Sequence, residues 1–212
     1  MTPVKYLEDL CKDIKPVTRP LTHGKMMSLW LSLSFFVLVL GISFLGLRND
    51  LWKQLSNLSF IGELLLLLVL SISASFVAFK SCIPSKRHWG YYSFIIPLLV
   101  WISVYAYKAY QLATISDLPS TMVTSGMTCS TYSFLLSLLP LSIGLSLIQT
   151  SRCVSPKLTG VTVSFASATI GGLGLILICS AAQPFHMLLW HILPVIGIGC
   201  AGVIIGHTLF KW

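Results

Sequence analysis

Six long apolar runs dominate this chain of 212 residues and limit what it can fold into. The runs cover residues 28–47, 60–79, 91–107, 131–148, 158–180 and 187–210. A helix needs about 20 apolar residues to cross a bilayer. At this length only a helix satisfies its own backbone in lipid, because the strands of a membrane barrel are shorter and alternate in polarity. The sequence therefore predicts an all-α polytopic membrane protein with six transmembrane helices.

The composition excludes an ordinary soluble domain and a disordered chain. Charged residues make up 9% of the chain and hydrophobic residues 55%, and the mean hydropathy is +0.86. Soluble domains carry about 25% charged residues, and disorder requires low hydrophobicity. The net charge of +8 comes from basic residues in short runs beside the apolar stretches, a pattern typical of membrane helices. We therefore expect lipid to surround the chain and no nucleic acid to bind it.

The distribution of Lys and Arg predicts how the spans are oriented. Eleven of the fourteen lie in the N-terminal segment, in the loops after spans two and four, and at the C-terminus. The opposite side carries Arg48, Lys53 and Lys108. Because cytoplasmic segments carry the excess of basic residues, we expect both termini in the cytoplasm.

Residues 1–27 have the pattern of a cytoplasmic tail ahead of a transmembrane domain of residues 28–212. Apolar residues at helical spacing predict an amphipathic helix over about residues 3–15, which Pro16 ends before a proline-rich connector. A helix this short is marginal alone in water, so its apolar stripe needs a surface. The membrane or the protein's own loops would provide one. We favour a groove on a partner protein, because the opposite face carries mixed charges, unlike a lipid-binding helix.

The predicted topology sorts the six cysteines, which include no CxxC pair. Cys11, Cys82 and Cys153 fall on the cytoplasmic side, where thiols are expected to stay reduced, and Cys200 lies within span six. The remaining two share the outer side at similar depth: Cys129 precedes span four and Cys179 ends span five.

The outer cysteines have three readings that the sequence leaves open. They form a disulfide if their Cα atoms come within reach, they bind a soft metal ion as thiolates, or they are unrelated buried residues. His186 and His191 belong to the same outer face and could complete a metal site.

Ionisable residues inside the spans are few. Glu63 lies about one turn inside span two, where an acid is a functional candidate by default, although it could also accept a hydrogen bond near the interface. A small six-span transporter or exporter is the alternative function, with Glu63 on its polar path. No paired carboxylates, nucleophile motif or phosphate-binding loop appears, so the sequence predicts no enzyme.

Small residues recur along two spans and would let helices approach closely. They are Gly160, Ser164, Ala168 and Gly172 in span five and Gly199, Gly202 and Gly206 in span six. Such faces serve packing within one chain and between chains equally well. The oligomeric state is therefore open, as is a purely structural role in a larger assembly.

Four segments together carry a family pattern. The tail reads Asp-Ile-Lys-Pro-Val-Thr-Arg-Pro-Leu over residues 13–21, and Arg-Asn-Asp-Leu follows span one at residues 48–51. Cys129 precedes Ser-Leu-Leu-Pro at residues 137–140, and Cys179 precedes Leu-Leu-Trp-His at residues 188–191. Over nearly its whole length the chain resembles the NrsF-type anti-sigma factors, bacterial inner-membrane proteins with six spans. Thr18 stands where that family usually has arginine, and Arg19 follows it.

The resemblance implies a regulator that holds an extracytoplasmic-function sigma factor at the membrane and releases it under stress. It implies that Cys129 and Cys179 sense heavy metals or oxidants, with no cofactor beyond a transient heavy-metal ion at this pair. It also implies that the tail binds the sigma factor. The tail residues expected to take part are Leu7, Leu10, Asp13, Ile14, Lys15, Pro16, Val17, Arg19, Pro20 and Leu21.

Overall fold

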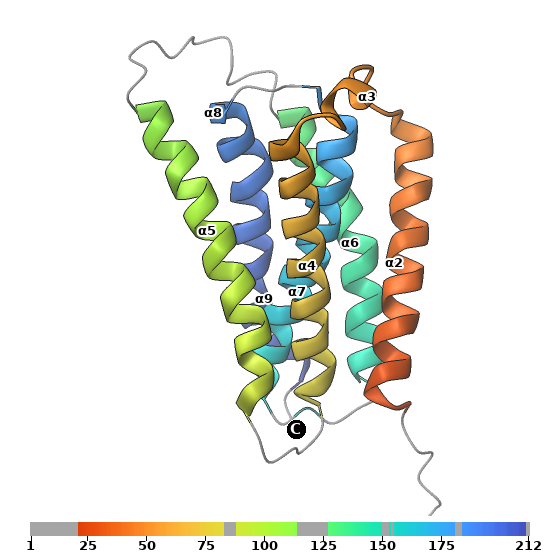
Figure 1. The fold of residues 1–212 in the computed structure, drawn as a ribbon. Helices are drawn as coiled ribbons and strands as arrows, with labels where there is room; N and C mark the ends of the chain where they lie inside the picture. The colour runs from red at the N-terminus through yellow and green to blue at the C-terminus, as the bar shows by residue number, and fades with distance from the viewer. Residues whose placement is uncertain are drawn as a thin grey trace, which may run out of the picture.

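Six long helices form an up-and-down bundle in the computed structural model, which describes residues 21–82, 88–113, 127–149, 153, 155–180 and 184–210 (Figure 1). The long helices are α2 (His23–Leu45), α4 (Leu58–Lys80), α5 (Tyr92–Ala113), α6 (Met127–Gln149), α7 (Pro156–Ile178) and α9 (Leu193–Leu209). The short elements are α3 (Leu51–Gln54), η1 (His88–Tyr91), α8 (Pro184–Met187) and a π-helical turn, η3 (Leu188–Ile192), which leads into α9. Within these described ranges, six helices are long and apolar enough to cross a membrane. The predicted all-α fold with six spans is confirmed.

The helix ends differ from the predicted span ends by a few residues. Apolar runs report the length buried in lipid, whereas a helix ends where the backbone conformation changes. For example, α2 begins at His23, inside the segment predicted as tail, and stops before Gly46, whose φ of 83° favours glycine. The Gly46 N–H donates to the Ile42 carbonyl at 2.8 Å and closes the last turn.

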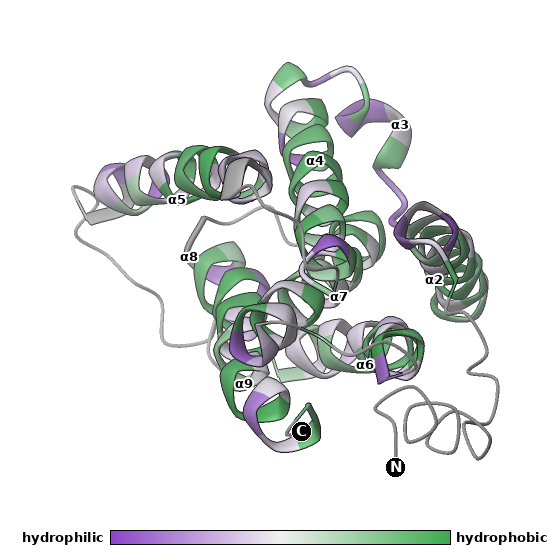
Figure 2. Cartoon of the chain, turned by 90° about the horizontal axis from the view of Figure 1, so that it is seen from below, coloured by the Kyte–Doolittle hydropathy of each residue, from purple (hydrophilic) through white to green (hydrophobic). Residues whose placement is uncertain are grey.

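Helix α7 is the centre of the bundle. It packs against α9, α4, α6 and α2, and almost every residue from Thr159 to Ile176 is buried. Figure 2 shows α7 enclosed by α4, α6 and α9, with α2 and α5 farther out. A helix buried on all sides and rich in small residues fits this position, because small side chains allow its neighbours to approach closely.

The small-residue faces predicted on spans five and six meet each other. A Cβ added at Gly160 would overlap the Gly202 carbonyl and the Gly206 backbone, and a Cβ at Gly206 would overlap the Pro156 carbonyl. These residues therefore pack α7 on α9 within one chain. This use of the faces favours packing inside the bundle over an interface for a larger assembly.

The outer helices α2 and α5 expose large apolar side chains, as lipid-facing helices do. Phe35, Phe36 and Phe44 of α2 are exposed. The inner face of α2 is fixed by Trp30, which is fully buried and donates from Nε1 to the Pro140 carbonyl of α6 at 2.8 Å. The arrangement is that of a membrane bundle, with polar contacts inside and apolar side chains outside.

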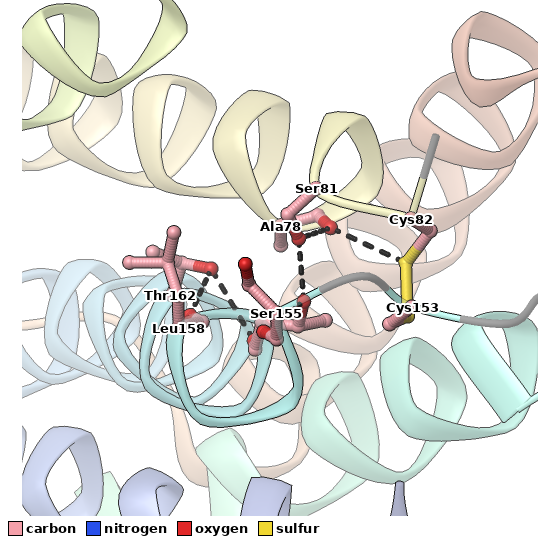
Figure 3. Close-up of a disulfide and its surroundings, with 8 residues drawn as sticks. Ala78, Ser81, Cys82, Cys153, Ser155, Leu158 and Thr162 are labelled. Carbon is pink, nitrogen blue, oxygen red and sulfur yellow. Dashed lines mark hydrogen bonds between the residues drawn. A yellow bond between two sulfur atoms is a disulfide. The ribbon is translucent and has the colours of Figure 1, made fainter. Parts of the chain in front are cut away.

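Cys82 and Cys153 are joined in a disulfide, which contradicts the expectation that both stay reduced (Figure 3). The expectation rested on compartment alone, whereas the pairing follows from packing. The end of α4 lies against the beginning of α7, where the Ser81 and Thr159 hydroxyls are hydrogen-bonded. This contact brings Cys82, just after α4, beside Cys153, just before α7.

The alternating course of the helices gives the bundle two distinct ends. Leu21, Lys80, Cys82, Lys157 and Phe210 lie at one end, here called the tail end, because it adjoins the N-terminal segment. The opposite end carries α3, α8, the beginning of α6 and the end of α7, and is here called the cysteine end.

Candidate functional site

The structure brings Cys129 and Cys179 together at the cysteine end. Cys129 is in the first turn of α6, and Cys179 follows the last residue of α7 in an extended conformation. Their Sγ atoms are 3.3 Å apart, and both thiols are free. Cys179 is buried and Cys129 is half-buried. Two residues 50 positions apart therefore form a dithiol between two helices that pack against each other.

His186 and His191 complete a compact cluster with the two thiols. Nε2 of His186 lies 3.7 Å from Sγ of Cys179, and the two imidazole rings are 5.7 Å apart in an edge-to-face arrangement. One ligand atom from each of the four residues lies within 4.8 Å of the others. Burial lowers the pKa of His186, which favours the neutral ring that can bind a metal. The pair of thiolates and two imidazoles is a ligand set able to hold a metal ion.

The position of His191 depends on the π-helical turn η3. Pro194 has no N–H to give to the carbonyl of residue 190, and its ring would clash with that carbonyl in a regular helix. The chain widens just before the proline, with the Leu193 N–H donating to the Leu188 carbonyl. This irregular turn carries His191. Turns of this kind are frequent at functional sites.

The imidazole of His191 is buried without a partner. The residue is 5% exposed, and neither Nδ1 nor Nε2 makes a hydrogen bond to any residue that the structure describes. Leaving a buried polar group unpaired costs about 1–3 kcal/mol. His191 therefore places two unbonded ring nitrogens in a cluster that also holds two thiols.

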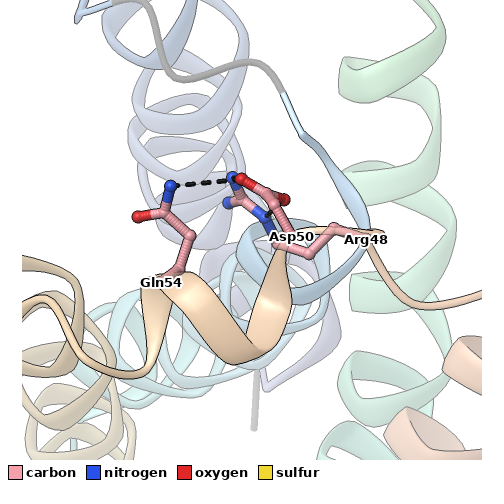
Figure 4. A network of polar contacts seen from close by, with 3 residues as sticks. All are labelled: Arg48, Asp50 and Gln54. Atoms are coloured by element: carbon pink, nitrogen blue, oxygen red, sulfur yellow. Dashed lines mark hydrogen bonds and ion pairs between the residues drawn. The ribbon is translucent and has the colours of Figure 1, made fainter.

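A polar network beside this cluster was not predicted from the sequence (Figure 4). Arg48 donates from Nε and Nη2 to the two carboxylate oxygens of Asp50 at 2.6 and 2.8 Å. The Gln54 amide donates to the same carboxylate at 3.1 Å. The hydrogen bonds from Arg48 and Gln54 hold the pKa of Asp50 well below its usual range. The Arg-Asn-Asp spacing was visible in the sequence, but it gave no sign of where the pair would dock.

Arg48 also ties the end of α2 to the end of α7. Its side chain is 3% exposed, and its backbone N–H donates to the Leu177 carbonyl at 3.1 Å. Leu177 lies two residues before Cys179. The connection between α2 and α3 therefore contacts the end of α7 two residues before Cys179.

Glu63, the acid predicted within span two, is partnered. It pairs with Lys108 of α5, and the Tyr105 hydroxyl lies 3.5 Å from its other oxygen. A cavity of about 480 Å³ beside the pair is lined by residues from the cysteine-end halves of α4 and α5, including Ser59, Ser103 and Gln111. These contacts agree with one of the two interpretations of Glu63 from the sequence, that of an acid that accepts a hydrogen bond.

Most of the tail residues expected to bind the sigma factor lie outside the described residues. This applies to Leu7, Leu10, Asp13, Ile14, Lys15, Pro16, Val17, Arg19 and Pro20. Leu21 is described, and it is exposed at the tail end, two residues before α2 begins. The expected sigma-binding and stress-sensing sites are thus joined to opposite ends of the bundle.

Comparison with known proteins gives one family. The family model described as NrsF, negative regulator of sigma F, matches residues 10–212. No curated protein and no solved structure matches the chain.

Proposed function

The chain belongs to the NrsF family of negative regulators of sigma F, and from this membership we propose that it sequesters an extracytoplasmic-function sigma factor through its N-terminal tail. The family supplies the coarse role, which is a membrane-embedded, non-enzymatic regulator whose partner is a sigma factor. The tail is our assignment, because residues 13–21 carry the motif and the preceding apolar stripe needs a groove.

We propose that the tail end faces the cytoplasm of a bacterium, where a sigma factor is found. The described chain begins at Leu21 and ends at Phe210 on the same end of the bundle (Figure 1). The basic residues Lys25, Lys80 and Lys157 belong to helix ends on that side. The positive-inside rule then supports a cytoplasmic tail end and an outer-facing cysteine end in the inner membrane.

The stress signal enters, in this proposal, at Cys129 and Cys179. The observation that carries it is the 3.3 Å separation of the two Sγ atoms. An oxidant such as hydrogen peroxide would accept two electrons and two protons from the thiols, leaving a disulfide and two molecules of water. A heavy-metal ion would instead displace the two protons and bind both sulfurs, and His186 and His191 are the nearest additional ligands.

The signal can reach the tail through α2. A reaction at Cys179 acts two residues from the Leu177 carbonyl, which accepts the Arg48 N–H just beyond the end of α2. Helix α2 then runs the length of the bundle to His23, inside the segment predicted as tail. A stress signal can change the binding state of the tail only if it favours one of two packings of the bundle over the other. The hydrogen bond between Arg48 and Leu177 makes α2 sensitive to the packing at the end of α7.

The test is co-purification from membranes of cells that produce the full chain or a chain lacking residues 1–21. We expect an RNA polymerase sigma factor with the full chain and none with the truncated one. The matched control is Lys157→Ala, which changes an exposed residue at the tail end and should retain the sigma factor. Equal recovery with and without residues 1–21 would contradict the assignment of the tail.

A further inference from the structure

We propose that Cys129, Cys179, His186 and His191 form a closed four-ligand site for a borderline-soft divalent cation of the Zn²⁺ and Cd²⁺ class. In this site the two histidines are needed only for cation binding. An oxidant reacts with the two sulfurs and does not need the histidines. The biological effect of cation binding rests on the proposed function, but the binding itself does not require a sigma factor.

The distances fit a tetrahedral site. With metal–sulfur bonds of about 2.3 Å and metal–nitrogen bonds of about 2.0 Å, ligand atoms sit about 3.3–3.8 Å from one another. The two sulfurs are 3.3 Å apart, the Cys179–His186 distance is 3.7 Å, and all four ligand atoms lie within 4.8 Å. Small side-chain rotations therefore suffice to place four donors around one ion.

His191 is the independent sign that a ligand belongs here. Both ring nitrogens are buried, and no described residue bonds to either. His186, by contrast, already directs Nε2 at Cys179. A metal ion between the sulfurs and the rings would give His191 the bond that the protein does not supply.

The local charges are compatible with a divalent cation. Binding releases one proton from each thiol to solvent and forms two metal–sulfur and two metal–nitrogen bonds, with no change in oxidation state. Two thiolates then balance the two charges of the ion. Arg48 is the nearby positive group, and its charge is already paired with Asp50 through two hydrogen bonds.

The ligand types set the selectivity. Thiolate and imidazole favour Zn²⁺ and Cd²⁺, whereas Mg²⁺ and Ca²⁺ require oxygen ligands. Four protein ligands leave no open position, so the site is suited to sensing or structure and not to catalysis. The site is not sealed from its surroundings, because Cys129 is only half-buried. Its chain neighbours Met127 and Ser130 line a groove of about 530 Å³ together with Trp190.

The experiment uses the full chain purified in detergent, with the cysteine-end thiols reduced and metals removed by chelation. Cd²⁺ is titrated and followed by its thiolate charge-transfer absorption, and Co²⁺ is added separately because its visible spectrum reports tetrahedral geometry. The variants are His186→Ala, His191→Ala and the control His207→Ala, which changes an exposed histidine near the other end of α9.

We expect one Cd²⁺ per chain and a tetrahedral Co²⁺ spectrum for the wild type and for His207→Ala. His186→Ala and His191→Ala should each weaken Cd²⁺ binding by at least about 10–100-fold, the loss that removing a ligand's outer partner already causes. Treatment with hydrogen peroxide should still yield the Cys129–Cys179 disulfide in both histidine variants, as identified by mass spectrometry. That product also shows that the variants keep the two thiols adjacent.

Wild-type affinity for Cd²⁺ in either histidine variant would overturn the four-ligand site, and so would an octahedral Co²⁺ spectrum or no binding by the wild type. These outcomes would leave sigma-factor retention by the tail untouched. Conversely, a chain that retains no sigma factor but binds Cd²⁺ as described would contradict the proposed function alone.

Discussion

At the scale of single residues, Asp50 matters because it neutralises a buried arginine. The Arg48 side chain is almost fully buried, and its two hydrogen bonds to Asp50 fix the connection that touches the end of α7. Removing one partner of a buried pair leaves the other charge uncompensated. Asp50→Asn should therefore lower the melting temperature in detergent at pH 7, whereas Lys53→Gln, an exposed change in the adjacent helix α3, should not.

The pH dependence has a definite sign. The folded-state pKa of Asp50 is depressed by Arg48 and Gln54, so its contribution to stability is fully present above the unfolded value of about 3.9. The contribution is lost as the pH falls below that value toward the folded-state pKa. Between about pH 5 and pH 2 the wild type should lose melting temperature more steeply than Asp50→Asn. Parallel pH profiles would show that Asp50 carries no such linkage.

The residues of the site differ in how far the sequence could predict them. Counting spans was enough to put Cys129 and Cys179 on one side, because each crossing reverses the chain. The contact of Arg48 with Leu177 could not be foreseen, since it depends on α2 packing beside α7. Cys82 and Cys153 were misjudged for the same reason, because their pairing follows from the contact between α4 and α7 and not from their spacing.

At the scale of elements, close packing of α7 on α9 is the feature most sensitive to substitution. Gly160→Ala would push a methyl group into the backbone of Gly202 and Gly206. Overpacking of this kind costs about 1–3 kcal/mol. Gly197→Ala, on the open face of α9, meets no atom within 4 Å and should be neutral or stabilising by up to about 1 kcal/mol. Thermal denaturation of both variants in detergent is the measurement, and equal melting temperatures would contradict the packing.

The disulfide makes a second prediction about elements, because it ties the end of α4 to the beginning of α7 across 71 residues. Closing a loop of this length is worth about 2–4 kcal/mol, chiefly through the unfolded chain. A membrane-permeant reductant should lower the melting temperature of the wild type and leave that of Cys82→Ser/Cys153→Ser unchanged.

Cys200→Ser is the control for the disulfide, since Cys200 is an exposed free thiol and this variant should respond to reductant as the wild type does. If the double variant and the wild type melt together under oxidising conditions, the bond does not contribute to stability.

The elements themselves were largely predictable. Each long apolar run forms a helix, because in lipid the backbone N–H and C=O groups of a single span find hydrogen-bond partners only within a helix. The helix ends and the turn before Pro194 were not predictable in detail, because capping at Gly46 and the widening at η3 depend on local backbone geometry. That widening matters for the site, since it carries His191.

At the scale of the whole molecule, the two sites that we propose belong to opposite ends of the bundle. The cysteine end holds the dithiol and the histidines, and the tail end adjoins the segment that we assign to the sigma factor. Cys179 directly follows helix α7 and Cys153 lies just before it, while α2 links the Arg48 contact to the tail. A tenfold fall in sigma-factor retention requires the binding free energy to differ by only about 1.4 kcal/mol between two packings of the bundle. A small change passed along α2 would therefore be enough.

The most direct test of the central claim uses the sigma factor that co-purifies with the protein. Its amounts in the membrane and cytosolic fractions are measured before and after treatment of cells with Cd²⁺ or hydrogen peroxide. We predict that the wild type and the Cys200→Ser control release it after either treatment. Cys129→Ser/Cys179→Ser should keep the sigma factor at the membrane throughout, because it has neither a disulfide to form nor thiolates to bind the ion. Release from this double variant at the wild-type level would contradict the account.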